Sequence, residues 1–391
     1  MKTSTQKALL ASAAIGVMTM GLAAPASAAP APLAPLASID IPVPADNPQT
    51  DTKVALGEKL FFDPRLGGDA SVSCGTCHEP ESGWAWSDSF SRGYPGTTHW
   101  RNSQTVINSA YYGKLFWAGA APSLEKQAKS AAKGGVAGNG ENDIMEARLA
   151  LIPEYVNSFR EVFGDEWPLI GNAWKAIAAY ERTLVQTDTP LDKYLEGDAS
   201  ALTEEQVRGK ALFEGKAGCI NCHNGALASD DAFHNIGVPY ATRWDEDGLA
   251  QITFRFEQYA KGVTEDLYRN VKDDMGLYYR SKFKSDKGKF RTPSLRYTMY
   301  TAPYMHNGAF FTLEEVIDFY DEGGFDEDGR TTDWPGNKSP LIKPLGLTDE
   351  EKEDLLVFLE AFSGDEILIE KPDLPEYAPL FSEAELMEVK K

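Results

Sequence analysis

The sequence is short of basic residues, of cysteine and of long hydrophobic segments. Its 391 residues hold 38 Lys and Arg against 59 Asp and Glu, a net charge of −21. A chain this acidic repels phosphate and has few basic clusters, so we expect no nucleic-acid partner. No hydrophobic run after residue 28 is long enough to cross a bilayer, which argues against a membrane span in the mature protein. The length suggests two domains, each with its own core.

The N-terminus has the pattern of a cleaved secretory signal over residues 1–28. Lys2 and Lys7 precede a short Ala- and Gly-rich apolar run, and Ala26-Ser27-Ala28 forms a small-residue cleavage site. We therefore expect a periplasmic protein rather than a membrane-anchored one. Residues 29–50 are rich in alanine and proline and are predicted to be a flexible lead-in.

The four cysteines are spaced for cofactor attachment rather than for disulfides. They form Cys74-Gly75-Thr76-Cys77-His78 and Cys219-Ile220-Asn221-Cys222-His223. In a C-x-x-C-H motif the two thiols bond covalently to a haem and the histidine ligates its iron. A single match could be a redox pair, but two complete motifs that use every cysteine predict two c-type haems.

The two motifs lie 145 residues apart and belong to an internal repeat. Residues 57–61, Gly-Glu-Lys-Leu-Phe, precede the first motif, and residues 209–213, Gly-Lys-Ala-Leu-Phe, precede the second. Both segments have the pattern of amphipathic helices that pack beside a haem.

A second repeated landmark follows each haem motif. Trp117 and His306 are each followed by Gly at +2, a hydroxyl residue at +6, Leu at +7 and Glu at +8. Ser123 and Thr312, the hydroxyl residues, are predicted to cap equivalent helices.

These two predicted helices differ where an axial ligand would lie. Fourteen residues after His306 comes Tyr320, whereas fourteen residues after Trp117 comes Ala131. A five-coordinate haem can activate peroxide, whereas a six-coordinate one stores or passes electrons. The spacing alone leaves Tyr320 open between an iron ligand and a core aromatic residue.

Together these residues resemble the bacterial di-haem cytochrome c peroxidase family over nearly the whole mature chain. The stretches that carry the resemblance are residues 101–103, 116–119, 176–184, 290–296 and 301–308. The resemblance implies a mostly α protein with two cytochrome-c-like haem domains in tandem, at residues 51–190 and 191–391. Ordinary members have Met where this chain has Tyr320. Tyrosine there is similar to the MauG-like branch, which oxidises tryptophans of a partner protein.

The resemblance implies a division of roles between the haems. Hydrogen peroxide would bind the open haem held by His78, and the haem held by His223 and Tyr320 would share a high-valent oxidised state through Trp117. The family has a distal Gln that corresponds to Gln127. Its distal Glu corresponds to Ala137, so we expect Glu141, the nearest carboxylate, to be the acid–base group, with Glu146 as the second candidate. The alternative for Glu141 is a helix N-terminal charge.

The resemblance also implies a calcium ion between the domains. Its ligands would be the side chain of Asn102 and the backbone carbonyls of Thr301 and Pro303, and oxygen ligands suit calcium.

Two other functions remain open at this point. One is an ordinary cytochrome c peroxidase that takes electrons from a small cytochrome or cupredoxin. The other is an electron carrier with two six-coordinate haems, which Ala131 opposes. Ala217 replaces the tryptophan through which MauG passes oxidation to its partner. The sequence therefore does not identify the residue through which oxidising equivalents would leave this protein.

Overall fold

The computed structural model describes residues 29–94, 96–239, 243–270, 274–325 and 337–378. The expected signal segment, residues 1–28, lies outside these ranges. The described part is mostly helical, as predicted, and its two sheets are antiparallel pairs of two-residue strands. Within these ranges no helix combines the length and the apolar character needed to cross a membrane.

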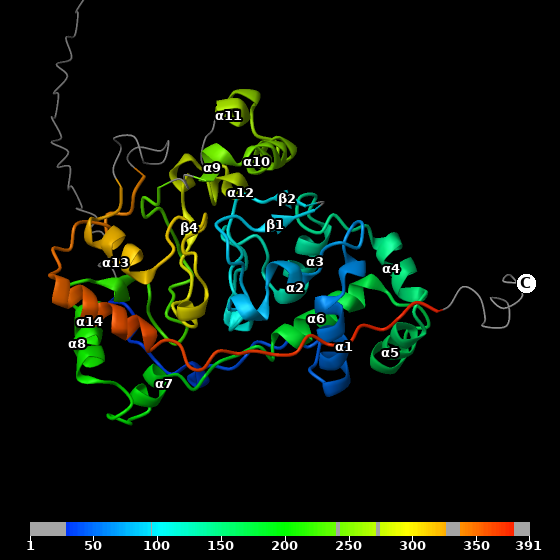
Figure 1. Cartoon of the computed structure of the whole chain (residues 1–391), viewed down its shortest axis with the longest axis horizontal. Helices are drawn as coiled ribbons and strands as arrows, with labels where there is room; N and C mark the ends of the chain where they lie inside the picture. Colours follow the sequence, from blue (N-terminus) through cyan, green and yellow to red (C-terminus); the bar gives the residue numbers. More distant parts are fainter. Residues whose placement is uncertain (1–28, 95, 240–242, 271–273, 326–336, 379–391) are drawn as a thin grey trace, which may run out of the picture.

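The helices form two groups that lie beside one another along the long axis of the molecule (Figure 1). The first group comprises α1 (Asp51–Phe62), α2 (Cys74–Cys77), α3 (Leu124–Lys133), α4 (Asn142–Ala150), α5 (Pro153–Phe163) and α6 (Ile170–Glu181). The second comprises α7 (Pro190–Leu195), α8 (Glu204–Glu214), α13 (Leu313–Asp321) and α14 (Asp349–Glu360). Each group surrounds its own hydrophobic core.

In each domain, the helix that precedes the haem motif crosses the last long helix at a glycine. A Cβ atom added to Gly57 of α1 would lie 1.9 Å from the carbonyl oxygen of Ala176 in α6. One added to Gly209 of α8 would lie 2.0 Å from that of Asp354 in α14. The backbones of the paired helices are therefore in direct contact, and the repeated glycine marks the same crossing in both domains.

This contact predicts that Gly57→Ala destabilises the first domain. The added methyl group must push α1 away from α6, and overpacking of this kind costs about 1–3 kcal/mol. Urea unfolding of the haem-loaded protein measures the loss. Gly171→Ala on α6 is the control, because its Cβ would meet nothing within 4 Å. Equal stability of Gly57→Ala and the wild type would contradict the backbone contact.

The repeat extends to the backbone of the loops that lead to Trp117 and His306. Left-handed backbone occurs nine residues and one residue before each of these positions, at Asn108 and Phe116 in the first loop and at Tyr297 and Met305 in the second. Non-glycine residues seldom adopt this conformation. The two loops therefore follow the same path, which agrees with a duplicated unit.

Residues 29–50, predicted to be a flexible lead-in, are mostly exposed but are anchored to the fold at a few buried residues. Leu33 and Leu36 are buried, and Leu33 belongs to the core of the second domain. The Leu36 N–H donates a hydrogen bond to the Asp192 carboxylate at 2.9 Å. Proline removes backbone donors and restricts φ, so an extended segment needs few partners, and the leucines anchor it. We call residues 29–50 the N-terminal strap.

Residues 365–378, the C-terminal strap, return from the second domain to the first. Ile367, Ile369 and Leu374 pack on the core of the first domain, and the Ile367 carbonyl accepts a hydrogen bond from the Trp84 indole at 2.7 Å. The second domain is therefore not the continuous block 191–391 that was expected. Both straps run along the lower edge of the molecule in Figure 1, where the N-terminal strap is blue and the C-terminal strap is red.

Residues 243–289, which we call the inserted segment, separate β3 (Phe233–His234) from β4 (Phe290–Arg291). They carry α9 (Arg243–Glu246), α10 (Gly248–Ala260), α11 (Glu265–Asn270) and α12 (Tyr278–Ser281), at the top of Figure 1. α10 packs on β2 (Thr97–Thr98), the partner strand of β1 (Arg92–Gly93), and the Thr253 hydroxyl donates to the Thr98 carbonyl at 2.7 Å. The second half of the chain thus covers part of the first domain.

Candidate active site: two haem pockets and their junction

Both C-x-x-C-H motifs line one continuous cavity of about 720 Å³. Cys74 and Cys77 bound α2, and Cys219 begins a short 3₁₀ helix that ends at Asn221. All four thiols, including that of Cys222, are free of disulfides and line the cavity. This donor set fits two covalently attached haems.

The two motif histidines are oriented as iron ligands. His78 Nδ1 lies 3.2 Å from the carbonyl oxygen of Trp84, and His223 Nδ1 lies 3.2 Å from that of Ala228. A hydrogen bond from Nδ1–H leaves Nε2 as the ligating nitrogen. Burial lowers the pKa of His78 and brings that of His223 to about 4, so both rings are neutral, as ligation requires.

Equivalent helices cover the two pockets, and they carry different residues toward the cavity. Ser123 caps α3 and Thr312 caps α13, as predicted, because each hydroxyl accepts an N–H three residues later. Ala131 of α3 and Tyr320 of α13 both line the cavity. Burial raises the pKa of Tyr320, so a phenolate there needs a cation such as ferric iron beside it.

Trp117 lies at the junction of the two pockets. Its side chain is buried, lines the cavity and donates its indole N–H to the Asn102 carbonyl at 2.9 Å. The ring centroid lies 6.4 Å from that of His306, and His306 stacks on Phe290 with centroids 3.6 Å apart. The two landmark residues of the repeat are therefore neighbours across the domain junction.

The pocket beside α3 contains Gln127 but not Glu141. Gln127 lines the cavity together with the glycine-rich loop of residues 134–138. The Glu141 side chain is 70% exposed, begins α4 and pairs loosely with Lys133 at 3.8 Å. Glu141 therefore lies outside the cavity, and the alternative of a charge at a helix N-terminus describes it. This corrects the expectation that it reaches the peroxide.

Two carboxylates do line the cavity among the described residues, and sequence reasoning assigned neither. They are Glu181, at the end of α6, and Glu257, on α10 of the inserted segment. Glu257 lies 120 residues after Ala137, and no motif in the sequence connects it with the first haem. Only the packing of α10 over the first domain indicates its place.

The three residues assigned to calcium all border the cavity. Asn102, Thr301 and Pro303 all line the cavity, and the Asn102 N–H donates to the His306 carbonyl at 2.8 Å. The Asn102 side-chain amide donates to the carbonyls of Trp86 and Asp88, which leaves Oδ1 without a donor among the described residues. An oxygen in this position fits a cation.

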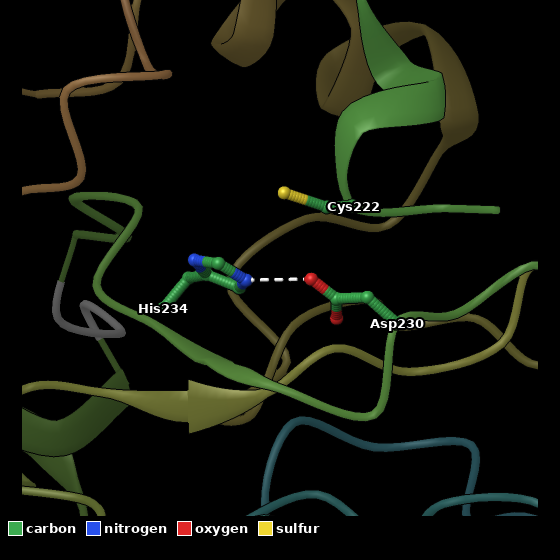
Figure 2. A group of neighbouring side chains, drawn as sticks. All are labelled: Cys222, Asp230 and His234. Atoms are coloured by element: carbon green, nitrogen blue, oxygen red, sulfur yellow. Dashed lines mark hydrogen bonds and ion pairs between the residues drawn. The ribbon is translucent and has the colours of Figure 1, made fainter. Parts of the chain in front are cut away.

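A polar cluster lies beside the second haem motif. Figure 2 shows Cys222, Asp230 and His234, with His234 Nε2 2.9 Å from Asp230 Oδ2. This hydrogen bond is the main cause that raises the pKa of His234 to about 10, so the ring is a cation at neutral pH. The three side chains are close enough to bind a metal ion, but Cys222 is needed for the haem. The cluster is therefore a His234–Asp230 ion pair beside the second haem motif.

The chain has two c-type haem sites, and the equivalent helices that cover them present Ala131 to one pocket and Tyr320 to the other. These features define a di-haem oxidoreductase. The sequence profile described as "Di-haem cytochrome c peroxidase" matches residues 51–200. "Cytochrome-c peroxidase IdrP1" of Denitromonas iodatirespirans is 55% identical over 95% of this chain and 97% of its own. "Methylamine utilization protein MauG" of Methylorubrum extorquens is 35% identical over 86% of this chain and 85% of its own.

A solved structure agrees with these relatives. A "MauG-like protein associated with microbial copper homeostasis" superposes with a TM-score of 0.71 at 32% identity, over 83% of this chain and 93% of its own. The chain belongs to the di-haem cytochrome c peroxidase family. This confirms the two-haem fold and a peroxidase-type oxidoreductase that uses hydrogen peroxide.

Proposed function

We propose that the protein is exported to the periplasm, uses hydrogen peroxide to oxidise both haems, and passes the oxidation to a tryptophan or tyrosine of a partner protein. One observation carries this proposal: α13 presents Tyr320 to the cavity where the equivalent α3 presents Ala131. An open iron site binds peroxide, whereas an anionic phenolate stabilises higher oxidation states. This difference suits sharing of oxidising equivalents between the haems.

The residues of the chain would act as follows. Cys74, Cys77 and His78 hold the first haem, and Cys219, Cys222, His223 and Tyr320 hold the second. The haems supply the iron that accepts peroxide and stores the oxidation. The Gln127 amide offers hydrogen bonds to peroxide in the first pocket. Trp117 offers an oxidisable ring between the pockets, fixed by its hydrogen bond to Asn102.

Asn102, Thr301 and Pro303 would hold a calcium ion that ties the domains together. Calcium at 100 times its Kd adds about 2.7 kcal/mol to the stability of the folded protein. We therefore expect chelation to lower the thermal midpoint of the haem-loaded protein, and restored calcium, but not magnesium, to recover it. An unchanged midpoint together with no calcium by elemental analysis would contradict this site.

A second function is favoured by the name of a relative. The protein that is 55% identical is called a cytochrome-c peroxidase. In this alternative the protein removes peroxide with electrons from a small cytochrome or cupredoxin. Ala217, which lines the cavity at the position of the MauG tryptophan, agrees with it.

Stopped-flow spectroscopy of the fully ferric protein with one equivalent of hydrogen peroxide separates the two functions. The proposal expects rapid formation of a long-lived species oxidised at both haems, with a near-infrared charge-resonance band. No reaction until one haem is reduced would contradict it and support the alternative.

A further inference from the structure

Cleavage of a peroxide O–O bond is fast when a side chain moves a proton between its two oxygens. The group must lie within hydrogen-bond reach of peroxide in the first pocket. Glu141 is too exposed for this role, and among the described residues the cavity offers the carboxylates of Glu181 and Glu257. The choice between these two rests on their surroundings.

Glu257 enters the first pocket from the inserted segment. Its Oε1 lies 3.7 Å from the point where a Cβ of Gly135 would be, so the carboxylate faces the glycine-rich loop. Trp100 and Val136 of the first domain form a buried cluster with Phe254 of α10, and the Trp100 and Phe254 ring centroids are 5.6 Å apart. The packing of α10 thus fixes Glu257 over the loop that contains Ala137.

The Glu257 side chain is largely enclosed and paired. It is 17% exposed, and its Oε2 lies 2.9 Å from Nζ of Lys261, one turn later on α10. Lys261 Nζ lies 5.5 Å from the centre of the Trp100 ring and also lines the cavity. This ion pair with Lys261 holds the Glu257 carboxylate in place at the edge of the cavity.

Glu181 has different surroundings. It is buried on α6, and one carboxylate oxygen has no partner among the described residues. Burial raises the pKa of Glu181 to about 8, so it is mostly protonated at neutral pH. Glu181 also lies near enough to Cys74 to contribute, after burial, to the raised pKa of that thiol, which places it toward the attached edge of the haem. A protonated acid in that position is poorly suited to take a proton from peroxide.

We propose that Glu257 is the acid–base carboxylate of the first haem pocket, with Lys261 as its positioning residue. The carboxylate takes the proton from the peroxide oxygen that binds iron and returns it to the other oxygen. The O–O bond would then break, the protonated oxygen would leave as water, and the bound haem would supply the two electrons. The inference rests on the peroxidase chemistry of the family and not on the identity of the electron donor.

The test uses the haem-loaded Glu257→Gln protein, which keeps the size of the side chain and removes its basicity. General acid–base groups contribute about 100- to 10,000-fold, so we expect the rate of the ferric protein with peroxide to fall at least about 100-fold. Glu265→Gln is the matched control, because this exposed residue lies on α11 of the same segment and pairs with Arg269. It should react like the wild type.

Cyanide supplies a second readout that needs no peroxide turnover. Hydrogen cyanide must lose its proton to bind ferric iron, so Glu257→Gln should slow cyanide association at the first haem below pH 9. Wild-type rates with both peroxide and cyanide in a Glu257→Gln protein with full haem content would overturn the inference. Slow rates in Glu181→Gln, with wild-type rates in Glu257→Gln, would also overturn it. A wild-type protein that needs prior reduction before it reacts with peroxide contradicts the proposed function, while the cyanide rates still test Glu257.

Discussion

Replacing Tyr320 by methionine is expected to raise the midpoint potential of the second haem strongly. An anionic phenolate stabilises ferric iron and a neutral thioether favours ferrous iron, so a rise of roughly 0.1–0.3 V is expected within the range that axial ligands span. Spectroelectrochemical titration of the two haems measures it. The variant should also lose the species oxidised at both haems when ferric protein meets peroxide.

The control for this substitution is Tyr304→Phe. Tyr304 also lines the cavity in the second domain, but its hydroxyl donates to the Thr298 carbonyl at 3.0 Å. Its loss should leave both potentials close to those of the wild type. If Tyr320→Met has the wild-type potentials, Tyr320 is a core residue and the second haem has another sixth ligand.

Trp117→Phe is expected to slow the sharing of oxidation between the haems by at least about 100-fold, which corresponds to about 2.7 kcal/mol in the barrier. Phenylalanine keeps an aromatic ring beside His306 but is far harder to oxidise than an indole. It also loses the hydrogen bond to the Asn102 carbonyl. Rapid-mixing spectra should then show oxidation at the first haem without the near-infrared band.

Trp174→Phe is the matched control, because Trp174 is another buried tryptophan that lines the cavity. Its substitution removes an indole without altering the junction. An equal loss of the band in both variants would indicate general disturbance of the haem pockets, and an unchanged band in Trp117→Phe would exclude Trp117 as the relay.

Sequence reasoning succeeded where short motifs determine local geometry. The C-x-x-C-H motifs carry both thiols and the histidine within five residues, so their role needs no knowledge of the fold. The hydroxyl caps and the offsets from Trp117 and His306 predicted two equivalent helices, and the structure contains them at α3 and α13. A duplicated unit repeats such local signals, which makes them easier to read.

It failed where long-range packing decides the outcome. Glu141 was chosen for its nearness to Ala137 along the chain, but it is the N-cap residue of α4 and its side chain is exposed to solvent. Glu257 reaches the pocket only because Phe254 packs on Trp100, a contact between residues 154 positions apart. The anchoring of the N-terminal strap could not be predicted for a similar reason, because composition does not reveal that Leu36 is buried beside Asp192.

The two straps have a consequence for how long an oxidised centre can survive. They cross the domain junction along one edge of the molecule, and the inserted segment lies at the opposite edge (Figure 1). At the junction, Trp117, Asn102 and His306 are buried. An electron vacancy on the junction thus has little direct contact with reductants in the surrounding solution. The oxidised state can therefore persist through collisions with other molecules until a partner protein docks and brings an oxidisable side chain within electron-tunnelling distance.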